Sequence, residues 1–134
     1  MNTGIKLLIV GAGMFVTGRG SKNKGTVLPA VFESCRNLEV SEIILATTSL
    51  TSANYAKKCI IDISKKLKIK IPYSVFPLKK NNNYEYLRVA KLFKPDAAII
   101  SVPDHLHFKI TSDLIRLKIH CLVVKPLCNT LKDA

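Results

Sequence analysis

The chain has 134 residues, a length that suits one domain, and 48% of them are hydrophobic and 22% charged, as in an ordinary globular protein. No apolar run approaches the roughly 20 residues of a membrane span, so we expect no membrane partner and a cytoplasmic location. The net charge of +12 invites a nucleic-acid partner, but the lysines are spread along the chain without an aromatic platform. We therefore expect no nucleic-acid partner.

The cysteines do not form a metal-binding pattern. Cys35, Cys59, Cys121 and Cys128 contain no C-x-x-C pair, and no histidine lies at zinc-finger spacing from them. We expect free, mostly buried thiols and no metal ion.

Apolar runs alternate along the chain with segments whose apolar residues repeat at helical spacing. In Thr51–Leu67, for example, Ala56, Cys59, Ile60 and Ile63 share one helical face. In chain order, the predicted elements are a strand at Ile5–Val10, a helix at Thr26–Cys35 with Thr26 as N-cap, a strand at Glu42–Thr47, a helix at Thr51–Leu67, an edge strand at Ile71–Phe76, a helix at Tyr84–Phe93, a strand at Ala97–Val102, a helix at His105–Leu117, a strand at His120–Val124 and the start of a helix at Thr130–Ala134.

This alternation predicts the fold class α/β: a doubly wound parallel sheet, Rossmann-like, in three layers α/β/α. Right-handed crossovers favour a strand order such as 3-2-1-4-5. Ligands of such sheets bind at the carboxyl ends of the strands, near the switch between the first and fourth strands. The segments Gly11–Gly13 and Ser101–Pro103 follow those two strands.

The first strand ends abruptly in Gly-x-Gly at Gly11 and Gly13. Glycines at this place let the backbone turn tightly and approach a pyrophosphate without an intervening Cβ. A strict G-x-G-x-x-G would have a third glycine at position 16, where this chain has Val16. The motif alone is therefore weak, and two turn glycines of any α/β domain are the alternative.

Two further segments carry a resemblance to a known family. The sequence after the fourth strand is SVPDHLH (residues 101–107), and the fifth strand ends in VVKPL (residues 123–127). Together with the glycine turn they resemble the nucleotide-binding half of the glucose–fructose oxidoreductase/inositol dehydrogenase (Gfo/Idh/MocA) family. Its P-x-x-x-H element is matched by Pro103 and His107, and its E-K-P element by Lys125 and Pro126, with Val124 in place of the glutamate.

The resemblance implies NAD(P) binding and hydride exchange with a sugar- or polyol-type substrate. In such a site Gly11 and Gly13 admit the pyrophosphate, and Met14 and Phe15 supply further amides and an apolar wall. The resemblance further implies that Ser101 and Pro103 line the cleft on the nicotinamide side and that His107 belongs to the scaffold of the site rather than acting as general base.

The resemblance makes Lys125 the candidate catalytic residue, beside the nicotinamide and the substrate. There a cation binds a hydroxyl and aids proton transfer, and burial would lower the lysine pKa toward the working range. Pro126 fixes the turn, with a Lys125–Pro126 bond that is either cis or trans. The alternative is a plain lysine after a strand.

The end of the second strand bears on the choice of cofactor. Many members of the family place there an acidic residue that binds the adenine ribose, whereas this chain has Thr47 and Thr48. Without a carboxylate, the 2′-hydroxyl loses its usual acceptor and a 2′-phosphate is not repelled. The sequence thus leaves NAD and NADP both open, with Arg19 or Lys22 as possible phosphate contacts beside the alternative of a solvated loop.

By the resemblance, residues 1–134 form one NAD(P)-binding domain, a fragment that lacks the C-terminal substrate domain of its own full-length chain. We expect weak dinucleotide binding without turnover from this part alone, and a homo-oligomer at full length. A non-catalytic dinucleotide-sensing or interaction module on the same fold is the alternative, and a basic nucleic-acid binder is a third reading.

Overall fold

The computed structural model describes residues 4–37 and 39–134. Its centre is a five-stranded parallel sheet in the order β3-β2-β1-β4-β5, which confirms the predicted doubly wound topology. The strands are β1 (Ile5–Val10), β2 (Val40–Ala46), β3 (Tyr73–Phe76), β4 (Ala97–Ile100) and β5 (His120–Val123).

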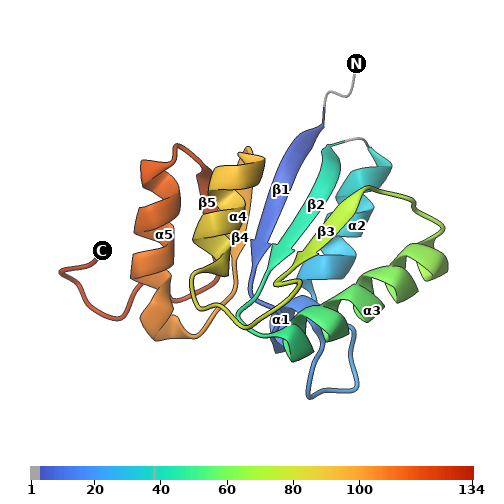
Figure 1. Cartoon of the computed structure of the whole chain (residues 1–134), viewed down its shortest axis with the longest axis horizontal. Coiled ribbons are helices and arrows are strands. Elements are labelled where there is room, and N and C mark those ends of the chain that lie inside the picture. The colour runs from blue at the N-terminus through green and yellow to red at the C-terminus, as the bar shows by residue number, and fades with distance from the viewer. Residues whose placement is uncertain (1–3, 38) are drawn as a thin grey trace.

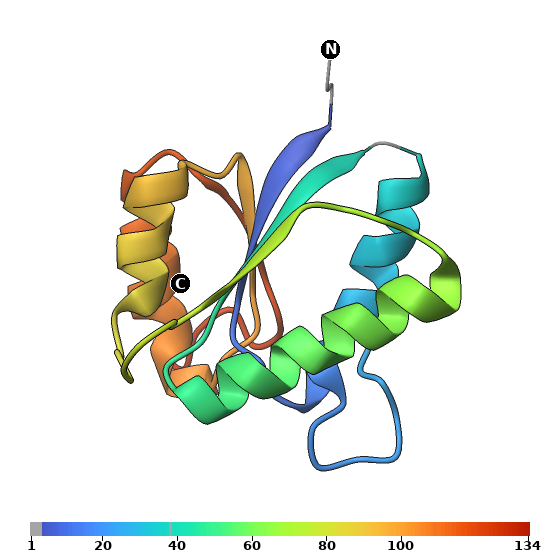
Figure 2. The same ribbon diagram turned by 45° about the vertical axis from the view of Figure 1, so that its right-hand side comes forward.

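Helices cover both faces of the sheet, so the molecule has three layers (Figures 1 and 2). One layer holds α2 and α3, and the other holds α4 and α5. The helices are α1 (Met14–Thr17), α2 (Val27–Arg36), α3 (Leu50–Leu67), α4 (Glu85–Phe93) and α5 (His107–Arg116), and α5 is preceded by the short 3-10 helix η1 (Asp104–Leu106). The carboxyl ends of the strands lie at the end of the molecule where α1 sits and α3 begins (Figure 1).

The side-chain alternation of β1 divides the core in two. Leu7 and Ile9 point into the cluster beneath α2 and α3, whereas Leu8 and Val10 point into the cluster beneath α4 and α5. Both faces of a central parallel strand are buried, which explains why the sequence shows a continuous apolar run there rather than alternation.

Several element bounds differ by one or two residues from the sequence-based expectations, and three further details differ as well. Residues Thr130–Ala134 form a turn, in which the Asp133 backbone N–H donates to Thr130 O, and not the start of a helix. Thr26 precedes α2 but does not cap it with its side chain, because its hydroxyl donates to Phe15 O at 3.3 Å. The short helix α1 was not predicted, since a single turn leaves no periodic pattern in the sequence.

The cysteines are free, as expected: Cys35 and Cys59 are buried and Cys121 and Cys128 are half-buried. Burial raises the pKa of the Cys35 thiol to about 11, so it stays protonated at neutral pH. In the part of the chain that the structure describes, no helix has both the length and the apolar character that crossing a bilayer requires.

The first residue of α4 is a buried glutamate with two partners. Glu85 is 4% exposed, accepts from Asn82 Nδ2 at 2.7 Å and is paired with the Arg88 guanidinium one turn later. The hydrogen bond from Arg88 is the main cause that lowers the pKa of this carboxyl, against the opposing effect of burial. Glu85 therefore stabilises the fold in its ionised form.

This ion pair predicts a loss of stability in acid. The contribution of Glu85 is fully present above the ordinary Glu pKa of 4.5 and disappears as the pH falls through the lower folded-state pKa. Glu85→Gln should lower the free energy of unfolding at pH 7 by about 1–3 kcal/mol and flatten its decrease toward acid. Urea denaturation across this pH range measures both effects.

Glu33→Gln is the matched control, because Glu33 forms the same i,i+3 pair with Arg36 on an exposed helix face. Its effect should stay below about 0.5 kcal/mol. Equal losses for the two variants would contradict the role assigned to Glu85.

Candidate functional site

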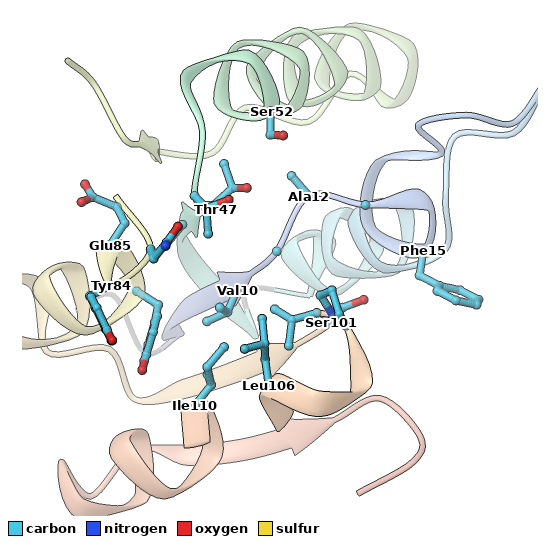
Figure 3. A pocket seen from close by; sticks show the side chains of 18 of the residues that line it. Val10, Ala12, Phe15, Thr47, Ser52, Tyr84, Glu85, Ser101, Leu106 and Ile110 are labelled. Atoms are coloured by element: carbon cyan, nitrogen blue, oxygen red, sulfur yellow. The ribbon is translucent and has the colours of Figure 1, made fainter. Parts of the chain in front are cut away.

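A cavity of about 770 Å³ opens at the carboxyl ends of β1, β2 and β4 (Figure 3). Its position is the topological switch point between β1 and β4. The glycine turn after β1, the start of α3, the start of α4 and the η1–α5 segment enclose it. The lining residues are Val10, Gly11, Ala12, Gly13, Met14, Phe15, Arg19, Ala46, Thr47, Thr48, Ser52, Asn83, Tyr84, Glu85, Tyr86, Ser101, Val102, Pro103, His105, Leu106, Lys109 and Ile110.

Gly11 is required by the fold. Its φ is +104°, and a Cβ added there would lie 2.0 Å from the carbonyl oxygen of Ser101. Its own N–H donates to Ala46 O at 2.8 Å, while the Ser101 N–H donates to Val10 O at 2.9 Å. The ends of β2, β1 and β4 are thus held together around a residue that has no room for a side chain.

Gly13 is different, because nothing lies within 4 Å of a Cβ built on it and its φ of −79° is open to any residue. The fold does not need a glycine here. A ligand that approaches the backbone closely would need one, because a side chain would occupy the same space. Within residues 4–37 and 39–134, the backbone N–H groups of Gly13, Met14 and Phe15 have no hydrogen-bond partner. The turn therefore offers an open space with free donors, as the phosphates of a dinucleotide require.

The cavity gathers most of the predicted cofactor-binding residues. Gly11, Gly13, Met14, Phe15, Thr47, Thr48, Ser101 and Pro103 all line it, whereas His107, Lys125 and Pro126 do not. The Phe15 side chain is 54% exposed and points away from the centre of the cavity in Figure 3, so its contribution is the backbone more than an apolar wall.

His107 connects the segment after β4 with the Lys125–Pro126 segment after β5. Its imidazole is 1% exposed, with Nε2 at 2.9 Å from Val102 O and Nδ1 in contact with Pro126 O. Each tautomer donates to one of these carbonyl groups. The ring thus joins the loop after β4 to the segment after β5, which is a scaffold role and leaves no free nitrogen for a general base.

Lys125 is not buried within this domain. The lysine follows β5 on an exposed segment, with a cis Lys125–Pro126 bond, and it lies outside the cavity. The preceding residue, Val124, donates its N–H to Ile100 O and ties the segment to the end of β4. The chain therefore places Lys125 next to the carboxyl end of the sheet without enclosing it.

The rim beyond β2 carries hydroxyl groups and one cation. Thr47 is half-buried and Thr48 exposed, and both face the cavity with Ser52 from the first turn of α3. Arg19, from the loop after α1, donates from Nη1 to Ser52 Oγ at 2.6 Å. The sequence left two alternatives for Arg19, a phosphate contact or a residue of a solvated loop. Only the tertiary fold brings that loop to α3.

The opposite wall is apolar and was missed from sequence. Leu106 and Ile110 point into the cavity from η1 and α5, and Tyr84 enters from the start of α4 (Figure 3). Burial and a hydrogen bond to Asp113 raise the pKa of Tyr86, so this phenol stays protonated at neutral pH. Helical periodicity could identify these apolar residues as buried but not as pocket walls.

One cavity of this doubly wound sheet combines an apolar wall that suits a base, hydroxyl groups that suit a sugar and free amides that suit phosphates. The residues present fit a dinucleotide, and they define the class: a Rossmann-type nucleotide-binding domain. The family is identified by its sequence model. The model of the Gfo/Idh/MocA oxidoreductase family, described as having an NAD-binding Rossmann fold, matches residues 5–134, and the chain belongs to that family.

Solved structures agree in fold. A Gfo/Idh/MocA family oxidoreductase from Vibrio cholerae is 15% identical with a TM-score of 0.61, over 96% of this chain and 32% of that one. The scyllo-inositol dehydrogenase of Lactobacillus casei, solved with NAD(H) and scyllo-inositol, is 14% identical with a TM-score of 0.60, over 98% and 31%. The WlbA dehydrogenase of Thermus thermophilus, solved with NAD and UDP-GlcNAcA, is 13% identical with a TM-score of 0.58, over 96% and 35%.

The chain thus spans about a third of the length of these solved relatives. A search of curated protein sequences finds no match.

Alanine at the two glycines should have different effects, on cofactor binding at position 13 and on stability at position 11. Gly13→Ala should fold normally but lower NADH affinity at least about tenfold, or about 1.4 kcal/mol, because a methyl group would occupy the space above the free amides. Gly11→Ala should lower the free energy of unfolding by more than about 3 kcal/mol. Thermal melts and NADH fluorescence titrations measure the two. A Gly13→Ala variant with unchanged affinity would place the phosphates elsewhere.

Proposed function

We propose that this chain is the cofactor-binding domain of an NAD(P)-dependent oxidoreductase that exchanges hydride with a sugar- or polyol-type hydroxyl or carbonyl group. The observation that carries the binding half of this proposal is the open space above Gly13 with unpaired backbone N–H groups around it. The substrate class rests on family membership, supported by relatives whose structures hold scyllo-inositol or UDP-GlcNAcA.

The cavity suggests the direction in which a dinucleotide lies. Its phosphates would accept from the amides of Gly13, Met14 and Phe15. The adenine would lie against the apolar wall that includes Leu106 and Ile110, and its ribose would meet Thr47 and Thr48 on the β2 rim. The nicotinamide would then extend past Ser101 and Pro103, toward the side of the sheet on which Lys125 lies.

The bound cofactor supplies the hydride acceptor, and the chain supplies position. Lys125 would donate a hydrogen bond to the reacting oxygen of the substrate and take part in moving its proton. Because Lys125 is exposed in this domain, we propose that a C-terminal substrate domain of the full-length chain encloses it. Residues 1–134 alone would bind the cofactor without turnover, since hydride transfer needs both reactants held together. We also propose a homo-oligomer at full length.

A non-catalytic dinucleotide sensor on the same fold is the second candidate. The substitution of Val124 for the family glutamate favours it, because this change removes a carboxylate beside Lys125. Titration of residues 1–134 with NADH, followed by the fluorescence of the cofactor, tests the binding that both candidates share. Saturable binding is expected, and its absence would overturn both. Turnover of a polyol by this part alone would contradict the proposed division between two domains.

Lys125→Met separates the two candidates in the whole protein. We expect kcat to fall about 100-fold or more while the affinity for NADH changes less than twofold, because Lys125 does not line the cavity. Lys132→Met, a nearby exposed lysine, is the control and should leave kcat unchanged. A whole protein that binds NADH but has no dehydrogenase activity to lose would favour the sensor.

A further inference from the structure

We propose that Arg19 and Ser52 form a subsite for the 2′-phosphate of NADP, so that this domain prefers NADP over NAD. The inference rests on the proposed function and adds a choice between cofactors that family membership does not make. It depends on the position of Arg19, on its free hydrogen-bond donors and on the absence, among the described residues, of a carboxylate that would pair with Arg19.

Arg19 is held on the β2 side of the cavity. Besides its bond to Ser52, its guanidinium lies 5.9 Å from the ring centroid of Tyr55, one turn further along α3. Its backbone N–H donates to Thr17 Oγ1 at 3.2 Å. A long side chain on a loop is thus oriented toward α3 by contacts at both ends, which lowers the entropy lost on binding an anion.

The hydroxyl of Ser52 is left as a donor. Its oxygen accepts from Arg19 and from Ser49 Oγ at 3.0 Å, which fills both lone pairs. Ser49 in turn accepts from the Ser52 backbone N–H. The Ser52 proton and the remaining guanidinium N–H groups have no partner among the described residues, and both side chains line the cavity. Figure 3 shows Ser52 on the side of α3 that faces Ala12 and Thr47. An arrangement of donors without an acceptor suits a phosphate rather than a ribose hydroxyl.

The charges of the residues that line the cavity also favour a phosphate. Among the described residues that line the cavity, Glu85 alone is acidic, and its carboxylate is occupied by Arg88 and Asn82. Lys109 is paired with Asp113 at 2.9 Å, whereas the described residues give Arg19 no acidic partner. A 2′-phosphate would therefore meet an unneutralised cation at the place where an NAD-specific site presents a carboxylate.

Position separates this subsite from the pyrophosphate subsite. Ser52 belongs to the first turn of α3, the helix that follows β2. Thr47 and Thr48 lie on the short connection between β2 and α3. In a doubly wound sheet the ribose of the adenosine lies beyond β2 and the pyrophosphate at the turn after β1. Arg19 is bound to the α3 side, and the free amides of Gly13–Phe15 are on the β1 side.

The test compares NADPH with NADH in fluorescence titrations of the wild type, Arg19→Met, Ser52→Ala and the control Lys22→Met. Lys22 is an exposed cation on the same loop but does not line the cavity. We expect the wild type to bind NADPH at least about tenfold more tightly than NADH. Arg19→Met should remove about 10- to 100-fold of NADPH affinity and leave NADH within twofold. Ser52→Ala should show a smaller loss in the same direction, and Lys22→Met none.

Competition by 2′-AMP and 5′-AMP provides a second measurement, in which 2′-AMP should displace NADPH better from the wild type but not from Arg19→Met. Equal affinity of the wild type for the two dinucleotides, or equal losses of both in Arg19→Met, would overturn the subsite while leaving cofactor binding intact. Binding of neither dinucleotide would overturn the proposed function itself. Thermal melts of each variant distinguish these results from unfolding.

Discussion

The site depends on the contact between Gly11 and the Ser101 carbonyl group. Because no side chain separates them, β1 and β4 can end side by side, and the loops after them diverge around a cavity. The hydrogen bonds that join the end of β1 to β2 and to β4 fix this arrangement from both sides. The amides after Gly11, the hydroxyl groups beyond β2 and the apolar wall of η1 and α5 are all placed relative to this point.

The described residues line the part of the cavity that would hold adenosine, whereas Lys125 lies outside the cavity. Tyr84, Leu106, Ile110 and Arg19 all belong to elements that the domain itself packs and orients. Lys125 has no comparable enclosure, although His107 fixes the segment that carries it. A division of this kind suits a module that holds a cofactor and presents its reactive end to another part of a protein.

Charge contributes to the site through placement rather than through number. The net charge of +12 comes mostly from exposed lysines, which lie on the helices and on the loops between elements. Among the described residues that line the cavity, Arg19 has no acidic partner, whereas Glu85 is paired with Arg88 and Lys109 with Asp113. Because exposed charges are screened over about 10 Å at 0.1 M ionic strength, Arg19 matters more for an anionic ligand in the cavity than the many surface lysines.

The sequence alone determined the fold class, the strand order and the family. Long apolar runs alternating with amphipathic segments admit few arrangements other than a doubly wound parallel sheet, and Gly11, Pro103, His107 and Lys125 occur in an order typical of one family. Local pattern also indicated most cavity residues that directly follow a strand, because the topology brings those positions to one edge. It failed at the chain end, where Thr130–Ala134 form a turn, since a cap-like threonine does not specify a helix without packing to support it.

Only the tertiary structure distinguished Gly11 from Gly13, since the two differ in what lies above them and not in residue type. It alone brought Arg19 to Ser52 across 33 positions of sequence and left Lys125 exposed. These features depend on long-range packing of loops and helix ends, for which the chain carries no periodic signal.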